Sequence, residues 1–189
     1  MSDPEIRVAT AADRAAVIDT VVAAFDQDPA FRWFFPTEAS WERNAHLFVG
    51  ALFDSRVASA ATWLADDGAA LAMWADPSAE SLRADLGALD AEALARLADY
   101  NEATEGGLPD TPFWYLGVLA TRPDRRGEQL ARRVAEQGLR RAKATGLPAY
   151  LETTNAANVG LYERSGWAVT AESHIDTLTI WVLRHEGLS

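Results

Sequence analysis

A chain of 189 residues, 49% of them hydrophobic, can form one ordinary globular domain with a real core, so we expect a single domain over 1–189. The absence of cysteine excludes disulfides, thiolate zinc sites and a cysteine nucleophile, and three scattered histidines argue against any metal site. The formal net charge of −11 disfavours nucleic acid as a partner, and no apolar run is long enough to span a membrane. The acidic first residues lack the features of a signal peptide, so we expect a cytoplasmic protein.

Hydrophobic periodicity and turn residues predict alternating helices and strands along the whole chain. Asp66-Asp67-Gly68 between two apolar runs is a strong signal for a β-hairpin, and the apolar run at 113–121 is typical of a buried central strand. The predicted elements, in chain order, are a strand at 5–9, a helix reaching residue 24, a loop at 26–36, a helix at 39–53, strands at 60–65 and 69–75, a helical region from 77 to 105, a strand at 113–121, a helix at 128–145, a strand at 149–153, a helix at 159–165 and a terminal hairpin. This order predicts an α/β domain built on one mixed sheet.

A basic, glycine-containing turn joins the predicted central strand to the helix at 128–145. Free backbone N–H groups and the positive end of the helix dipole meet there, which suits an anion. Gly127 lets the backbone approach a phosphate closely, and Arg126 and Arg132 can add charge-assisted hydrogen bonds. The turn alone also fits an ordinary strand–turn–helix whose basic face is solvated.

Two segments carry a resemblance to a known family. Residues 116–131 (LGVLATRPDRRGEQLA) resemble the coenzyme A motif of the GNAT acetyltransferase superfamily, a strand followed by (Q/R)-x-x-G-x-(G/A) and a helix. Arg126, Gln129 and Ala131 fall on its defined positions, although the family usually has glycine where Gln129 stands. Residues 158–167 (NVGLYERSGW) resemble the family's N-x-x-(F/L)-Y-x-x-x-G-(F/W) segment. The likeness extends over most of the chain to puromycin N-acetyltransferase and its actinobacterial relatives.

The resemblance implies the GNAT fold, a mixed and mostly antiparallel sheet flanked by helices, in which a bulged fourth strand splays from the fifth to admit the cofactor. It also implies acetyl-CoA as co-substrate, and it allows a homodimer, which is common in the superfamily. The residues expected to bind the cofactor lie on the end of the central strand, on the turn and helix after it, and in the second motif: Leu119, Ala120, Thr121, Arg126, Gly127, Gln129, Leu130, Ala131, Arg132 and Asn158.

The implied reaction is direct transfer of an acetyl group from a thioester to a primary amine through a tetrahedral oxyanion, which a backbone N–H near Leu119 or Ala120 could stabilise. The resemblance puts Tyr162 near the sulfur, where its phenol is suited to protonate the leaving thiolate as general acid. Glu152, on the strand expected to face the gap, is the expected general base, unless it forms an ordinary ion pair with an arginine. His46 and His174 are weaker candidates for the base.

The predicted loop at 26–36 is dense in aromatic residues, and exposed aromatic rings call for a partner. We therefore expect Phe31, Trp33 and Phe34 to bind the acceptor, a small-molecule amine such as an antibiotic or another aminated metabolite. A protein or peptide acceptor is one alternative, since an acidic groove would suit a basic peptide. A non-catalytic acyl-CoA-binding regulatory domain is another; Gln129 favours it and the retention of Tyr162 argues against it.

Overall fold

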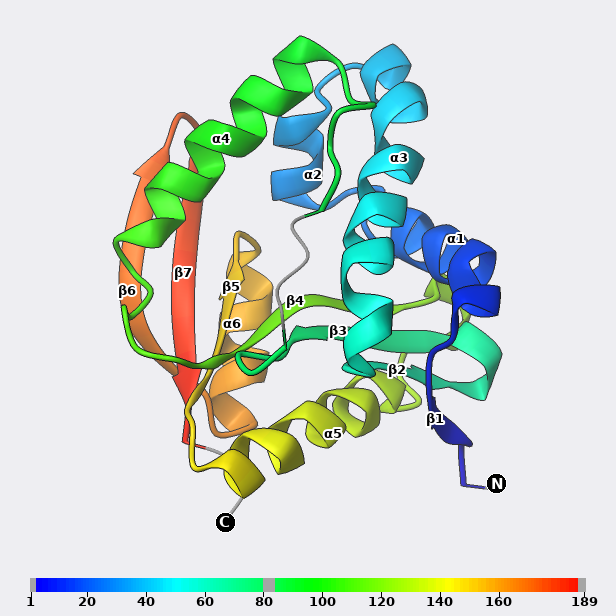
Figure 1. The fold of residues 1–189 in the computed structure, drawn as a ribbon. Helices are drawn as coiled ribbons and strands as arrows, with labels where there is room; N and C mark the ends of the chain where they lie inside the picture. The colour runs from blue at the N-terminus through cyan, green and yellow to red at the C-terminus, as the bar shows by residue number, and fades with distance from the viewer. Residues whose placement is uncertain (1–2, 80–83, 187–189) are drawn as a thin grey trace.

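The computed structural model describes residues 3–79 and 84–186, which form one seven-stranded sheet flanked by helices (Figure 1). The strands are β1 (Ile6–Val8), β2 (Thr62–Ala65), β3 (Ala70–Ala75), β4 (Trp114–Thr121), β5 (Ala149–Thr153), β6 (Ala168–Ile175) and β7 (Leu178–His185). The helices are α1 (Arg14–Ala24), α2 (Pro29–Phe34), α3 (Glu38–Arg56), α4 (Ala91–Glu105), α5 (Leu130–Thr145) and α6 (Ala156–Arg164).

The strands are ordered β1-β2-β3-β4-β5-β7-β6. The β4–β5 pair is parallel and the other pairs are antiparallel. The predicted mixed, mostly antiparallel sheet is therefore confirmed, as are the hairpin of β2 and β3 and the terminal hairpin of β6 and β7.

Two apolar clusters lie on opposite faces of the sheet. The larger one packs α1 to α4 against the sheet, with Phe31, Phe48 and Phe53 among its buried side chains. The smaller one packs α5 against the other face, where Trp74 and Trp114 are almost fully buried. Burial of such large rings supplies most of the stabilisation of this kind of core.

The predicted loop at 26–36 is wrong, because α2 forms there. The Asp28 carboxylate caps this helix by accepting the backbone N–H groups of Ala30 and Phe31, and Pro29 occupies the first turn, where its missing N–H costs nothing. Once helical, the segment turns its aromatic rings into the core, so the three rings expected to be exposed are buried: Phe31, Trp33 and Phe34 retain 6%, 9% and 4% of their exposure.

Other predicted helix boundaries shift for local reasons. The helix expected from residue 77 starts only at Ala91, capped by Asp90; the carboxylates of Asp76 and Asp85 instead hold short turns, and residues 80–83 lie outside the described part. The helix expected from residue 128 starts at Leu130, because Gln129 adopts a left-handed conformation with φ of 60°. The helix expected from residue 159 starts at Ala156, because Asn155 caps it.

A fork opens in the middle of the sheet, between β4 and β5. The two strands pair only at Trp114↔Ala149 and Tyr115↔Tyr150, and they then diverge, as Figure 1 shows. Along its other edge, β4 carries a bulge: Trp74 pairs with Leu116 but Met73 pairs with Val118, so Gly117 is the extra residue. Because of the bulge, two residues that are two apart on β4 face opposite sides of the sheet. Leu116 packs on the α5 side, whereas Val118 packs on the α3 side. The bulged and splayed fourth strand that the resemblance implied is confirmed.

Candidate active site

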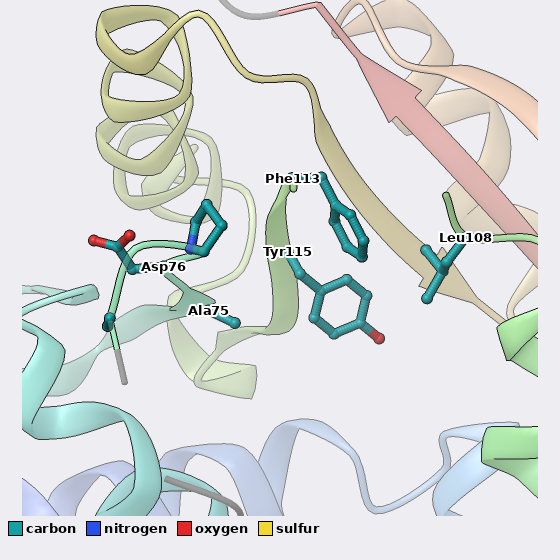
Figure 2. Close-up of a pocket in the computed structure, with 7 residues that line it drawn as sticks. Ala75, Asp76, Leu108, Phe113 and Tyr115 are labelled. Atoms are coloured by element: carbon teal, nitrogen blue, oxygen red, sulfur yellow. The ribbon is translucent and has the colours of Figure 1, made fainter. Parts of the chain in front are cut away.

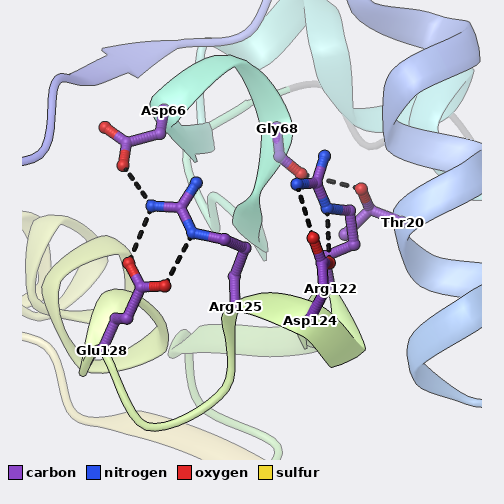
Figure 3. Close-up of polar contacts among 7 residues, drawn as sticks. All are labelled: Thr20, Asp66, Gly68, Arg122, Asp124, Arg125 and Glu128. Atoms are coloured by element: carbon purple, nitrogen blue, oxygen red, sulfur yellow. Dashed lines mark hydrogen bonds and ion pairs between the residues drawn. The ribbon is translucent and has the colours of Figure 1, made fainter.

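Ion pairs fix the turn between β4 and α5. The Arg125 guanidinium lies 2.9 Å from the Asp66 carboxylate in the β2–β3 turn and 2.7 Å from that of Glu128, and Arg122 pairs with Asp124 at 2.7 Å (Figure 3). The β2–β3 turn is tied in addition to α1, because the Thr20 hydroxyl donates to the Gly68 carbonyl at 2.7 Å (Figure 3). These contacts neutralise two of the basic side chains that the sequence brings together in this turn.

Arg126, the remaining arginine of this turn, has no carboxylate within ion-pair distance among the described residues; its Nη2 donates only to the Ala24 carbonyl, at 3.3 Å. Gly127 has φ of 87° and open space where a side chain would be. Across the described part of the chain, the backbone N–H groups of residues 127–132 donate no hydrogen bond to another residue. An exposed arginine beside unpaired N–H groups at the start of α5 is an arrangement that fits a pyrophosphate.

Gln129 occupies a position that favours glycine. Its left-handed backbone costs a residue with a side chain roughly 1–2 kcal/mol, and glycine would adopt it freely. The departure from the family motif therefore leaves the shape of the turn unchanged, and Gln129 adopts the unfavourable left-handed backbone conformation. Its side chain is exposed, and so are those of Arg126 and Arg132.

The edge of β4 that faces the fork is open. Beyond Tyr115, β4 forms no ladder with β5, so the backbone of residues 116–121 is unpaired with a strand on that side. The predicted cofactor residues Leu119, Ala120 and Thr121 all lie on this stretch. An edge of this kind can pair with an extended ligand as it would with a further strand.

Glu152 lies on β5, at the opposite wall of the fork. Its Oε2 accepts a hydrogen bond from the hydroxyl of Tyr115, and it forms no ion pair with a described residue, so the ordinary ion pair left open as an alternative is not found. Burial raises the pKa of Glu152 to about 7, against the opposing effects of the Tyr115 hydrogen bond and the charge of Arg56. The carboxylate therefore titrates near neutral pH, as a general base should.

Tyr162 lies on α6, one turn after Asn158, and both side chains are half-buried. The Tyr162 ring packs 6.1 Å from that of Trp167. Burial raises the pKa of Tyr162 to about 12, and the charges of Glu152 and Asp28 act in the same direction. Glu152 on β5 and Tyr162 on the following helix α6 are therefore close enough for the charge of one to act on the other, and the tyrosine is protonated at neutral pH.

Two members of this cluster, Arg56 and Tyr115, are not predicted from the sequence. Arg56 ends α3; its Nη1 donates to the Leu52 carbonyl at 3.2 Å, and its Nε is buried without a partner among the described residues. Tyr115 lies in an apolar run, and its hydroxyl is the feature of that run that could have indicated a polar role. Nothing local marks Arg56, because its role depends on where the end of α3 meets the sheet.

Tyr115 also lines an open depression of about 280 Å³ beside the fork. Figure 2 shows the ring of Tyr115 next to that of Phe113, with Leu108 on one side and Ala75 and Asp76 on the other. Most of this wall is apolar. The Asp76 carboxylate lies at its margin, where it points away from the Tyr115 ring and accepts hydrogen bonds from Ser78 (Figure 2). The depression can hold the apolar body of a small ligand.

The aromatic residues predicted to bind the acceptor do not line this depression. Phe31 and Phe34 pack in the core, and the Trp33 indole N–H donates to the Asp176 carboxylate at 3.0 Å. The exposure that suggested their role is absent, because α2 is a buried helix. His46 and His174, the weaker candidates for the base, are both exposed.

The chain is similar to known proteins in both sequence and fold. A model of the GNAT acetyltransferase family matches residues 18–167. A histone acetyltransferase HPA2-related acetyltransferase from Corynebacterium glutamicum is 22% identical, with a TM-score of 0.73, and the match covers 100% of this chain and 98% of that one. Arylalkylamine N-acetyltransferase 2 from Aedes aegypti is 14% identical, with a TM-score of 0.72 and coverage of 98% and 99%. The PaiA N-acetyltransferase from Thermoplasma acidophilum in complex with coenzyme A is 11% identical, with a TM-score of 0.62 and coverage of 98% and 99%.

Two features are absent from the residues that the structure describes. None of their helices has both the length and the apolar character needed to cross a bilayer. Nor do three or more of their His, Asp or Glu side chains gather where they could hold a metal ion.

Proposed function

The chain belongs to the GNAT acetyltransferase family, and on this basis we propose that it transfers the acetyl group of acetyl-CoA directly to a primary amine of a small molecule. The observation that carries the proposal is the fork between β4 and β5, with a carboxylate that titrates near neutral pH on one wall and an open strand edge on the other. A half-buried, protonated tyrosine completes the set of groups that acyl transfer requires.

Acetyl-CoA would supply the acetyl group as an activated thioester. Its pyrophosphate would be held by the turn before α5, where Arg126 provides charge and Gly127 lets the backbone come close. The other residues proposed to hold the cofactor at this turn and helix start are Gln129, Leu130, Ala131 and Arg132. The backbone of Leu119, Ala120 and Thr121 would pair with the pantetheine arm, and Asn158 would contact the same arm from α6.

Glu152 and Tyr162 would divide the proton transfers between them. Glu152 removes a proton from the incoming ammonium, so that the free amine can attack. Tyr162 donates its hydroxyl proton toward the departing sulfur. The surroundings that raise the pKa of Tyr162 would also raise that of the thiol, because burial disfavours charge on either group, so the two remain suited to each other.

The depression beside Tyr115 is the proposed place for the body of the acceptor. Its apolar wall favours an amine with an aromatic or aliphatic body, and the net charge of −11 favours a cation. The likeness to a mosquito arylalkylamine N-acetyltransferase is compatible with such an acceptor. An antibiotic or another aminated metabolite stays within this class. The specific likeness to puromycin N-acetyltransferase, a cytoplasmic location and a homodimer stay predictions.

A panel of amines tests the proposal. The full chain is incubated with acetyl-CoA and arylalkylamines, polyamines, an aminonucleoside antibiotic or a lysine-containing peptide, and thiol release is followed together with the mass of the product. We expect turnover with at least one small amine. Glu152→Gln and Tyr162→Phe should each lower kcat by about 10²-fold or more while the KM for acetyl-CoA changes little.

Two outcomes would overturn the proposal. Transfer to the peptide alone would identify a protein acetyltransferase. Tight binding of CoA without transfer to any amine would identify a non-catalytic acyl-CoA-binding domain.

A further inference from the structure

Tyr115 bridges the fork at the point where it opens. It forms the last β4–β5 pair, opposite Tyr150, so its backbone is fixed by sheet pairing on both sides. Glu152 lies two residues after Tyr150 on β5, so its side chain is on the same face of the sheet as those of Tyr150 and Tyr115. It is therefore the diagonal cross-strand neighbour of Tyr115. The Tyr115 hydroxyl reaches across the widening gap and donates to Glu152 Oε2.

Only one oxygen of Glu152 is engaged in this way. Among the described residues, no other side chain donates to the carboxylate, so Oε1 keeps its capacity to accept a proton. A carboxylate on a flexible side chain loses rotamer freedom when it is held, and Tyr115 provides the contact that holds it. The Tyr115 ring also lines the depression, so the carboxylate is held next to the proposed acceptor site.

Arg56 and Gly117 complete this arrangement. A Cβ atom on Gly117 would lie 3.1 Å from Arg56 Nη2 and 3.3 Å from Tyr115 Cε1. A side chain on the bulge residue would therefore crowd both the guanidinium and the phenol ring, which approach β4 at Gly117. Arg56 is close enough to Glu152 and Tyr115 for its charge to act on both.

We propose that Tyr115 is a positioning residue for acetyl transfer, which holds the Glu152 carboxylate across the β4–β5 fork with one oxygen free for the amine proton, while Arg56 supports the carboxylate form from α3. This inference rests on the proposed role of Glu152 as the base. Tyr115 acts through Glu152 and takes no part in bond making.

The direction of the expected effect follows from the groups around Glu152. These are Arg56 from α3, Tyr100 from α4, Tyr115 from β4 and Tyr162 from α6. Asp28, before α2, acts on two of these tyrosines, Tyr100 and Tyr162. The Tyr115 hydrogen bond and the Arg56 charge both favour the carboxylate, so removing either raises the pKa of Glu152. A change that merely loosened the core would have no reason to move this pKa in that direction.

The test compares Tyr115→Phe with Tyr150→Phe, which removes the same single hydroxyl group from the neighbouring strand. One readout needs no turnover: the Glu152 carboxyl carbon is titrated by NMR in glutamate-labelled protein and assigned by its loss in Glu152→Gln. The other is the pH profile of kcat. We expect both midpoints to rise by roughly one pH unit in Tyr115→Phe and to stay in place in Tyr150→Phe.

Kinetics separate positioning from a structural role. At neutral pH, Tyr115→Phe should lower kcat with an unchanged KM for acetyl-CoA, and raising the pH should restore part of the loss. Unchanged midpoints, or an equal loss of rate at every pH, would overturn the inference. If the wild-type chain transfers no acetyl group, the proposed function fails, but the NMR titration still decides whether Tyr115 holds Glu152.

A second pair of variants, at Arg56, tests the same titration in case Tyr115→Phe does not fold. Arg56→Met keeps the length of the side chain but removes its charge, and it should raise the midpoint of the Glu152 titration. Arg56→Lys keeps the charge and should leave the midpoint closer to that of the wild type. Equal midpoints in Met and Lys variants that are both folded would contradict the part assigned to Arg56.

Discussion

The carboxyl group of Glu152 should make a pH-dependent contribution to the stability of this protein. Glu152 has a pKa of about 7 in the folded chain, against 4.5 for an unperturbed glutamate, because it is partly withdrawn from solvent beside the fork. Between these two values the folded state binds a proton that the unfolded state does not bind. Stability therefore falls as the pH rises from 4.5 through 7, and it levels off once the folded carboxyl is ionised.

The size of the effect follows from the pKa difference. A difference of 2.5 pH units corresponds to about 3.4 kcal/mol at most. The Glu152 side chain is half-buried and retains some access to solvent, so the measured change will be smaller. Between pH 5 and pH 8 we expect a change of about 2 kcal/mol.

Glu152→Gln isolates this contribution, because glutamine keeps the shape of the side chain and removes its titration. Urea unfolding of both proteins at several pH values from 5 to 8 gives the difference in their free energies of unfolding. We expect the wild type to lose about 2 kcal/mol relative to the variant across this range. Glu163→Gln, on the exposed side of α6, serves as the matched control. A difference that stays constant with pH, or one that shifts in favour of the wild type as the pH rises, would refute the reasoning.

Three further predictions concern the turn and the packing of α5. Gln129→Gly should raise the free energy of unfolding by about 0.5–1 kcal/mol in urea titrations, because relief of the left-handed strain exceeds the added chain entropy. Gly138→Ala should lower it by about 1–2 kcal/mol, because the new methyl group would fall within the Trp74 indole and overpacking outweighs the gain in helix propensity. Arg126→Ala should weaken CoA binding by about tenfold in calorimetric titrations, with a smaller loss at high salt.

Controls for these variants come from the same elements. Gly106→Ala places a methyl group at the end of α4 in open space, so its stability should stay near that of the wild type. Arg122→Ala removes an arginine that is already paired with Asp124, so it should affect CoA binding less than the loss of Arg126. Stabilisation by Gly138→Ala, or equal effects of the two arginine variants, would contradict the account of α5 and its turn.

Much of the fold could be predicted because its signals are local. The Asp66-Asp67-Gly68 turn and the left-handed Gly146 mark the ends of elements within a few residues of sequence. The missed helix α2 carried local signals too: Asp28 followed by Pro29 is a capping residue followed by the residue favoured in the first turn. The density of aromatic residues favours a loop prediction only if the rings are exposed, and these rings are core residues once the helix forms.

The candidate site was predictable only where a motif carries it. Glu152 and Tyr162 lie in recognisable segments, and the structure brings both to the fork region. Tyr115 and Arg56 could not be assigned, because their contact with Glu152 depends on the register of β4 with β5 and on the packing of α3. Interactions between residues far apart in sequence leave no periodic pattern in the sequence. The surroundings that set the pKa of Glu152 therefore emerge only from the three-dimensional structure.

Acetyl transfer at the fork is the central claim, and the ratio of CoA thiol released to acetylated amine formed tests it most directly. With isotopically labelled acetyl-CoA and the best amine of the panel, one labelled acetyl-amine should form for each thiol released. Tyr162→Phe should bind CoA as the wild type does while losing most of this product. Tight CoA binding with no labelled amine from any acceptor, or full product formation by Tyr162→Phe, would contradict the account.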